Sequence, residues 1–246
     1  MDKKMFCFQC EQTVGCTGCT GNAGVCGKKA DTAKLQDELT GALISLAKAA
    51  DSTETISKRT GQIIIEGLFT TVTNVSFDNA AIENMIQKVR AEKERLVPDC
   101  RTEEYDLQQL WNANEDIRSL KSLILFGIRG MAAYAYHANV LNYEDAEVNQ
   151  FFCEALSKIG YEESTEALLS TVLKTGEINL KCMALLDKAN TETYGTPEPT
   201  DVTLTVEKGP FIVVTGHDLK DLQLLLEQTE GKGINIYTHG EMLPAH

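Results

Sequence analysis

Cysteine is concentrated at the start of this chain, where five of its eight cysteines fall within the first 26 of 246 residues. They are Cys7, Cys10, Cys16, Cys19 and Cys26, and glycines at 15, 18, 21, 24 and 27 are interleaved with them. Glycine lets a backbone wrap closely around a group and point N–H groups at sulfur atoms. This density is typical of a metal site, and it predicts an iron–sulfur cluster with a redox or electron-transfer function.

Two other uses of these cysteines compete with the cluster. A disulfide framework belongs to an oxidising compartment, but no apolar leader segment precedes the first cysteine. A zinc site would use the two Cys-x2-Cys pairs, yet only five residues separate them, where such zinc motifs leave about 15–20. An iron–sulfur cluster on Cys7, Cys10, Cys19 and Cys26 has gaps of two, eight and six residues and leaves Cys16 as a spare thiol.

Charge and hydropathy restrict the partners and the compartment. A formal net charge of −13 disfavours nucleic acid and anionic membranes, since both bind basic surfaces. No stretch approaches the roughly 20 uncharged apolar residues that a membrane-spanning helix needs. We therefore expect a cytoplasmic protein with no nucleic-acid or membrane partner. Cys100, Cys153 and Cys182 stand singly, and the default for such residues is an inert thiol.

Helical periodicity covers most of the chain after the cysteine loop. A first helix is expected to be capped by Asp31 or Thr32, and a third by Asp78. The first helix has Leu35, Leu39, Leu43 and Leu46 at helical spacing, and the third ends before Pro98. Two further helices are expected at about 59–71 and 115–140, with two or three more between 143 and 190. Gly127 and Gly130 inside the 115–140 helix indicate either close helix contact or a break.

The pattern changes at 196–199, where two prolines interrupt the helical period. The apolar, β-branched run at 210–216 predicts a buried parallel strand, followed by an amphipathic helix at 218–229 and a second strand at 234–237. This order is a βαβ unit. The domains are therefore expected at 1–30 (cluster loop), 31–195 (helical bundle) and 196–246 (the start of a Rossmann-like α/β domain).

Three polar side chains follow the two predicted strands. His217 comes after the first strand, and His239 and Glu241 come after the second. Ligands of parallel α/β sheets bind at the carboxyl ends of the strands, so His217 and Glu241 are candidate metal ligands or an acid–base pair. Taken alone, each of these residues is weaker evidence, because a histidine in a strand–helix turn is more often a cap or hydrogen-bond donor than a metal ligand. His239 is equally suited to supporting a ligand without binding the metal itself. His137 is expected to be structural on a helix face.

Five sequence blocks carry a resemblance to a known family. They are MFCFQCEQ at 5–12, GMAAY at 130–134, GEINLK at 176–181, VTGHDL at 214–219 and YTHGEMLPA at 237–245. Together, and in this order, they resemble the hybrid cluster protein family, also called prismane protein or hydroxylamine reductase. The resemblance implies an architecture similar to carbon monoxide dehydrogenase, with a helical N-terminal domain followed by two Rossmann-like domains.

The resemblance also implies two metal centres. It assigns Cys7, Cys10, Cys19 and Cys26 to a [4Fe-4S] cubane, and His217 and Glu241 to a hybrid Fe–S–O cluster. Two departures are the extra Cys16 and a gap of six rather than five residues before the last ligand. They leave the third ligand open between Cys16 and Cys19, and Cys19 is preferred.

The remaining hybrid-cluster ligands of the family are not in this sequence, so we expect an N-terminal portion, such as a fragment or one piece of a split protein. For the whole protein, the resemblance implies reduction of hydroxylamine or a related small nitrogen oxide, with an electron-donor protein as partner. The chain alone is expected to be inactive and to pair with a complementary C-terminal chain. The alternatives are a non-catalytic electron-transfer or interaction module and an inactive truncated fragment.

Overall fold

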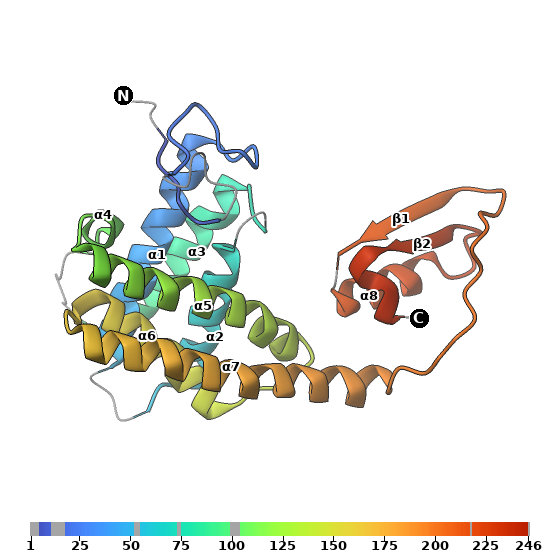
Figure 1. Cartoon of the computed structure of the whole chain (residues 1–246). Coiled ribbons are helices and arrows are strands. Elements are labelled where there is room, and N and C mark those ends of the chain that lie inside the picture. The colour runs from blue at the N-terminus through green and yellow to red at the C-terminus, as the bar shows by residue number, and fades with distance from the viewer. Residues whose placement is uncertain are drawn as a thin grey trace.

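A computed structural model describes residues 5–10, 18–51, 55–72, 75–98, 104–216 and 218–245. It is mainly helical, with a small parallel sheet near the C-terminal end of the chain (Figure 1). The elements, in chain order, are α1 (Ala30–Ala50), α2 (Lys58–Thr70), α3 (Asn79–Leu96), α4 (Leu107–Trp111), α5 (Glu115–Val140), α6 (Ala146–Tyr161), α7 (Thr165–Tyr194), β1 (Phe211–Thr215), α8 (Leu219–Thr229), β2 (Asn235–His239) and a 3-10 helix, η2 (Gly240–Ala245).

One apolar core holds the helices together. α1 packs against α3 and α6, α2 packs against α5, and α7 runs along α5. Leu39, Leu43 and Leu46 recur at helical spacing on α1 and are fully buried in this core. The predicted face of α3 is buried too, with Ile82, Met85, Ile86 and Val89 on one side. The predicted helical fold is therefore confirmed.

The cap predicted for α3 is present, whereas the cap predicted for α1 is not. The side chain of Asp78 accepts hydrogen bonds from the N–H groups of Ala80 and Ala81 and caps α3, as predicted. The predicted cap of the first helix is wrong, because α1 begins at Ala30 and Asp31 lies in its first turn. A carboxylate there interacts favourably with the helix dipole, which explains its position without a capping role.

Helix α5 runs unbroken through both of its internal glycines. A Cβ atom on Gly127 would lie 3.0 Å from Cγ2 of Thr175 on α7, so this glycine permits close contact between the two helices. A Cβ on Gly130 would meet nothing within 4 Å. The short helix α4 was not predicted, because its five residues are too few to show a helical period.

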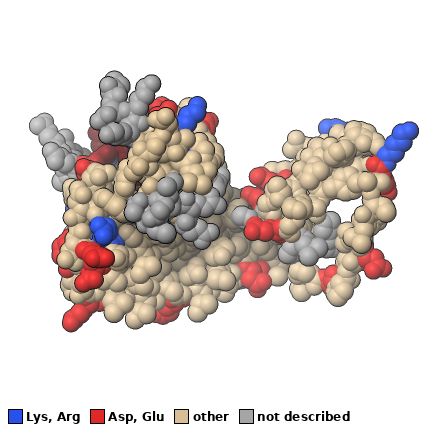
Figure 2. Space-filling model, turned by 45° about the horizontal axis from the view of Figure 1, so that its top comes forward, with Lys and Arg blue, Asp and Glu red and all other residues tan. Residues whose placement is uncertain are grey.

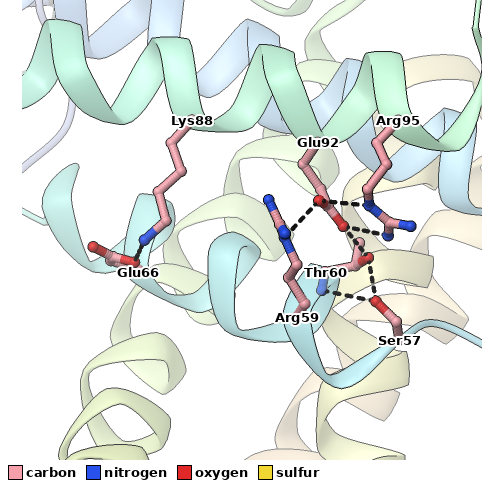
Figure 3. Close-up of polar contacts among 7 residues, drawn as sticks. All are labelled: Ser57, Arg59, Thr60, Glu66, Lys88, Glu92 and Arg95. Carbon is pink, nitrogen blue, oxygen red and sulfur yellow. Dashed lines mark hydrogen bonds and ion pairs between the residues drawn. The ribbon is translucent and has the colours of Figure 1, made fainter.

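The buried carboxylate of Glu92 ties α2 to α3 (Figure 3). Its side chain is fully buried and lies 3.0 Å from Nε of Arg59 and 2.7 Å from a guanidinium nitrogen of Arg95. Thr60 Oγ1 donates to it at 2.7 Å. The N–H of Thr60 also donates to Ser57, the cap of α2, at 3.1 Å. The start of α2 is thus fixed on α3, and the hydrogen bonds from Arg95 lower the pKa of Glu92.

Strands β1 and β2 pair in parallel, with α8 as the crossover between them. This confirms the predicted βαβ unit. The expectation that the first strand is buried is wrong, since Phe211 and Val213 are 62% and 58% exposed. The reason is that the described residues provide only two strands and one crossover helix for this sheet.

Acidic side chains are spread over the face seen in Figure 2, on both the helical part and the α/β part, with few basic side chains between them. This distribution agrees with the net charge of −13. No helix within the described ranges is long and apolar enough to cross a membrane.

Candidate metal centre

The N-terminal loop brings Cys7 and Cys19 side by side. Each donates its N–H to the carbonyl of the other, at 3.1 and 2.7 Å, in an isolated antiparallel bridge. Gly18 precedes the bridge with φ +145°, and a Cβ there would approach the Phe6 ring to 3.0 Å. A glycine is therefore needed for this turn, both for its backbone angle and for its lack of a side chain.

The four predicted cubane cysteines line one small cavity. Cys19 is buried, whereas Cys7, Cys10 and Cys26 are half-buried. The rest of the wall comes from Met5, Gln9, Gly24, Val25 and Lys28. Cys16 lies outside the described residues, so the choice between it and Cys19 stays a prediction.

Gly24 leaves space beside Cys26 and Met5 in the cavity wall. A Cβ on Gly24 would lie 3.5 Å from Sγ of Cys26 and 3.2 Å from the terminal methyl of Met5. A larger residue would fill space beside the sulfur. Glycine at position 24 therefore keeps the space beside the Cys26 sulfur open.

The donor set fits an iron–sulfur cluster. Four thiols in a partly apolar wall are the ligands that such a cluster requires, one for each iron of a cubane. The fit is one of donor type and number, because no three His, Cys, Asp or Glu side chains among the described residues are grouped as they would be around one metal ion. Burial raises the pKa of Cys7, so its free thiol is neutral at neutral pH. Coordination to a metal ion favours the thiolate instead.

Aromatic packing holds the loop on the helical body. The rings of Phe6 and Phe8 each lie 4.7 Å from the ring of Trp111 at the end of α4. Phe8 also contacts Phe126 of α5, with ring centroids 5.9 Å apart. The unpredicted helix α4 therefore anchors the two phenylalanines that flank Cys7.

A lysine in the cavity wall was not singled out from the sequence. Lys28 is 1% exposed, and its Nζ donates to the side-chain oxygens of Gln9 and Gln36. Nε2 of Gln9 in turn donates to Asp37 of α1 at 3.5 Å. In the sequence Lys28 stands next to Lys29 in a polar segment, so no pattern distinguishes it from a surface lysine.

A second buried cation approaches from α5. Arg129 is 5% exposed, its Nη2 donates to Thr40 Oγ1 at 2.6 Å, and its buried Nε has no hydrogen-bond partner among the described residues. Burial lowers its pKa to about 10, which still leaves it charged at neutral pH. Burial also raises the pKa of Asp37 to about 6, against the opposing charges of Arg129 and Lys28.

The second predicted site lies at the carboxyl edge of the sheet. Thr215 ends β1 opposite His239, which ends β2 and so belongs to the strand rather than following it. Gly216 and Gly240 turn the chain at this edge with φ +135° and +62°. Glu241 follows in η2 and is exposed. The structure therefore places Glu241 at the predicted edge, while His217 lies outside the described residues and its position stays a prediction.

This edge faces the helical body. Asp218 caps α8 by accepting the N–H of Asp221 at 3.0 Å, and its other carboxylate oxygen lies 3.4 Å from Nδ1 of His137 on α5. A pocket between the two parts is lined by residues that include Tyr134, Leu186 and Leu219. His137 does lie on a helix face as predicted, and its ring also contacts Asp218 of the α/β unit.

The isolated cysteines Cys153 and Cys182 are buried in the core. Their Sγ atoms lie 3.5 Å from the carbonyl of Ala47 and 3.6 Å from that of Met131. Burial raises the pKa of both thiols to about 12. Both thiols are buried, as is typical of inert cysteines, and Cys100 lies outside the described residues.

Comparison with known proteins identifies the family of this chain. The model of the Prismane/CO dehydrogenase family matches residues 5–246, and the chain belongs to this family. Hydroxylamine reductase of Thermodesulfovibrio yellowstonii is 46% identical, over 98% of this chain and 50% of that protein. The hydroxylamine reductases of Porphyromonas gingivalis and Clostridium perfringens are 43% and 42% identical. These alignments cover 100% and 98% of this chain, but 50% and 49% of the relatives.

The chain thus spans about half the length of the curated relatives that it matches. The predicted family is confirmed, and the match corresponds to an N-terminal portion of it.

Proposed function

We propose that this chain is the N-terminal part of an iron–sulfur oxidoreductase of the hybrid cluster type, which reduces hydroxylamine or a related small nitrogen oxide. The observation that carries the proposal is the single cavity lined by Cys7, Cys10, Cys19 and Cys26. It is supported by the family match and by relatives named hydroxylamine reductase. A bound cubane would supply one-electron transfer, and a hybrid cluster would polarise the N–O bond.

The residues of this chain divide between the two centres. The four cysteines hold the cubane, and the packing of Phe6 and Phe8 on Trp111 fixes the loop that carries Cys7 to the helical body. His217 and Glu241 supply one nitrogen and one carboxylate donor for the second centre. Such a pair cannot fix several irons, because soft thiolate donors are also needed. The remaining ligands would come from a C-terminal portion or complementary chain, and the electrons from a donor protein.

The first experiment tests the cubane. The chain is purified anaerobically, and its intact mass, iron, acid-labile sulfide and zinc are measured. We expect about four irons and four sulfides per chain, with visible absorbance that bleaches on reduction. Zinc without sulfide would show that the cavity is a zinc site and would contradict the proposal.

The second experiment tests catalysis. Hydroxylamine reduction breaks the N–O bond and consumes two electrons and two protons to give ammonia and water. The iron-loaded chain is assayed for ammonia with a strong artificial electron donor, alone and with the C-terminal half of the Thermodesulfovibrio yellowstonii relative. We expect background turnover alone and robust turnover with the added half. A loaded cubane with no turnover in either case would favour the alternative, a non-catalytic electron-transfer module.

A further inference from the structure

Two buried basic side chains act on the cysteine loop. Lys28 forms part of the cavity wall with 1% of its surface exposed, and Arg129 of α5, which is 5% exposed, interacts electrostatically with Cys7. Within the part of the chain that the structure describes, neither cation forms an ion pair with a carboxylate. Buried charges without an opposite charge are costly, so this arrangement calls for an explanation.

The hydrogen-bond partners of Lys28 are neutral. Its Nζ donates to Oε1 of Gln9 at 3.4 Å and to Oε1 of Gln36. These amides accept two of the three hydrogen bonds that an ammonium group can donate, but they supply no negative charge. Gln9 stands between Cys7 and Cys10 in the sequence, so the ammonium group is linked directly to the segment that carries two predicted ligands.

Asp37 does not balance the positive charge of Lys28 and Arg129. Asp37 accepts a hydrogen bond from Gln9 at 3.5 Å and interacts electrostatically with both Lys28 and Arg129. The other acid that interacts with Asp37 is Asp106, which is exposed, so water and salt screen its charge. One carboxyl group shared by two buried cations therefore leaves an excess of positive charge beside the cavity. The structure therefore favours an anionic occupant, and a cluster with four thiolate ligands carries net negative charge.

We propose that Lys28 is the counter-charge of a cubane bound by Cys7, Cys10, Cys19 and Cys26, and that it raises the cluster's reduction potential. The inference rests on the proposed function, because it requires the cubane. Reduction adds one electron from a low-potential one-electron donor and breaks no bond. A buried cation stabilises the added negative charge, and charge near a cluster is among the factors that set its potential.

The test compares Lys28→Met, Lys28→Arg and the control Lys29→Met in the full 246-residue chain. Midpoint potentials are measured by redox titration monitored by visible absorbance and electron paramagnetic resonance. We expect Lys28→Met to lower the reduction equilibrium constant at least tenfold, a shift of about 59 mV to more negative potential. Lys28→Arg keeps the charge and should shift less than half as far. Lys29 is exposed, so water and salt screen its charge and Lys29→Met should have little effect.

A second measurement uses the iron-free chain. There Lys28 is a buried charge without its counter-ion, so Lys28→Met should raise the Tm of the iron-free form, whereas Lys29→Met should leave it unchanged. A purely structural lysine would give the opposite result, a lower Tm with or without iron. If Lys28→Met does not retain iron, its midpoint potential cannot be measured. The Tm of its iron-free form then distinguishes a counter-charge from a purely structural lysine.

Three outcomes would overturn the inference, at two levels. Equal potentials for iron-loaded Lys28→Met and Lys29→Met, or a lower Tm of iron-free Lys28→Met, would refute the role of Lys28 alone. Wild-type chain without iron and sulfide would refute the proposed cubane as well, and it is detected before any substitution is made.

Discussion

Nδ1 of His137 lies 3.4 Å from Oδ2 of Asp218, and this contact joins α5 of the helical body to the start of α8 in the α/β unit. Asp218 also caps α8 through its other oxygen. The same residue therefore fixes the direction of α8 and holds the carboxyl edge of the sheet toward α5. Residues 195–210, which connect α7 to β1, are exposed throughout.

The first prediction concerns this contact. Asp218→Asn retains an oxygen that can cap α8 but removes the negative charge. We expect unchanged helix content by circular dichroism and faster protease cleavage within 195–210, because the α/β unit is held less firmly. Asp221→Asn, an exposed substitution one turn further along α8, is the control. Cleavage of Asp218→Asn at the rate of Asp221→Asn would show that the contact does not restrain the α/β unit.

The second prediction concerns the choice of ligands. Replacing Cys7, Cys10, Cys19 or Cys26 with Ala should abolish or severely disturb the cluster, since each thiolate binds its own iron. Cys16→Ala and the buried control Cys182→Ala should retain iron and sulfide. Cluster content and visible spectra of the purified variants measure the effect. Loss at Cys16 with tolerance at Cys19 would reverse the assignment of the third ligand.

The third prediction concerns the sheet edge. In the protein completed with a C-terminal half, Glu241→Gln and His217→Ala should each weaken the second cluster and lower the rate of hydroxylamine reduction. The cubane signal should stay, because its proposed ligands lie in the N-terminal loop. Glu230→Gln, at the other end of α8, serves as the control. Normal turnover in a variant lacking both donors would exclude them from the mechanism.

The fourth prediction concerns the stability of the helical body. Glu92→Gln should lower the free energy of unfolding by about 2 kcal/mol, because hydrogen bonds to a buried charged group contribute about 1.5–3 kcal/mol. Glu66→Gln removes a carboxylate that is 42% exposed and paired with Lys88, so its cost should be about 0.5 kcal/mol or less (Figure 3). Urea denaturation at neutral pH measures both.

The pH dependence of this effect has a definite sign. The pKa of Glu92 is lowered in the folded state from its ordinary value of 4.5, chiefly by the hydrogen bonds from Arg95. Its stabilising effect is therefore fully present above pH 4.5 and is lost as the pH falls through the lowered folded pKa. The difference between wild type and Glu92→Gln should shrink over the same acidic range. A difference that grows on acidification would contradict the role of the carboxylate.

Local patterns in the sequence determined much of this protein. The bounds of α5 match the prediction at both ends, because an apolar period of 3.6 residues and a cap act over a few neighbouring positions. The βαβ order and the parallel pairing of its strands follow from short connections in the same way. The density of cysteine and glycine also identified the loop whose thiols line the cavity.

Only the tertiary structure decided which side chains meet. Lys28 has the same local sequence character as its exposed neighbour, and it is buried because the loop folds back onto Gln36 of α1. Helix α4 is too short for a periodic signal, yet it supplies Trp111 as the support of the loop. The exposure of β1 depends on how many strands flank it, and the sequence of the strand itself does not determine that number. Burial is a property of contacts between distant segments, so periodicity and caps cannot determine it by themselves.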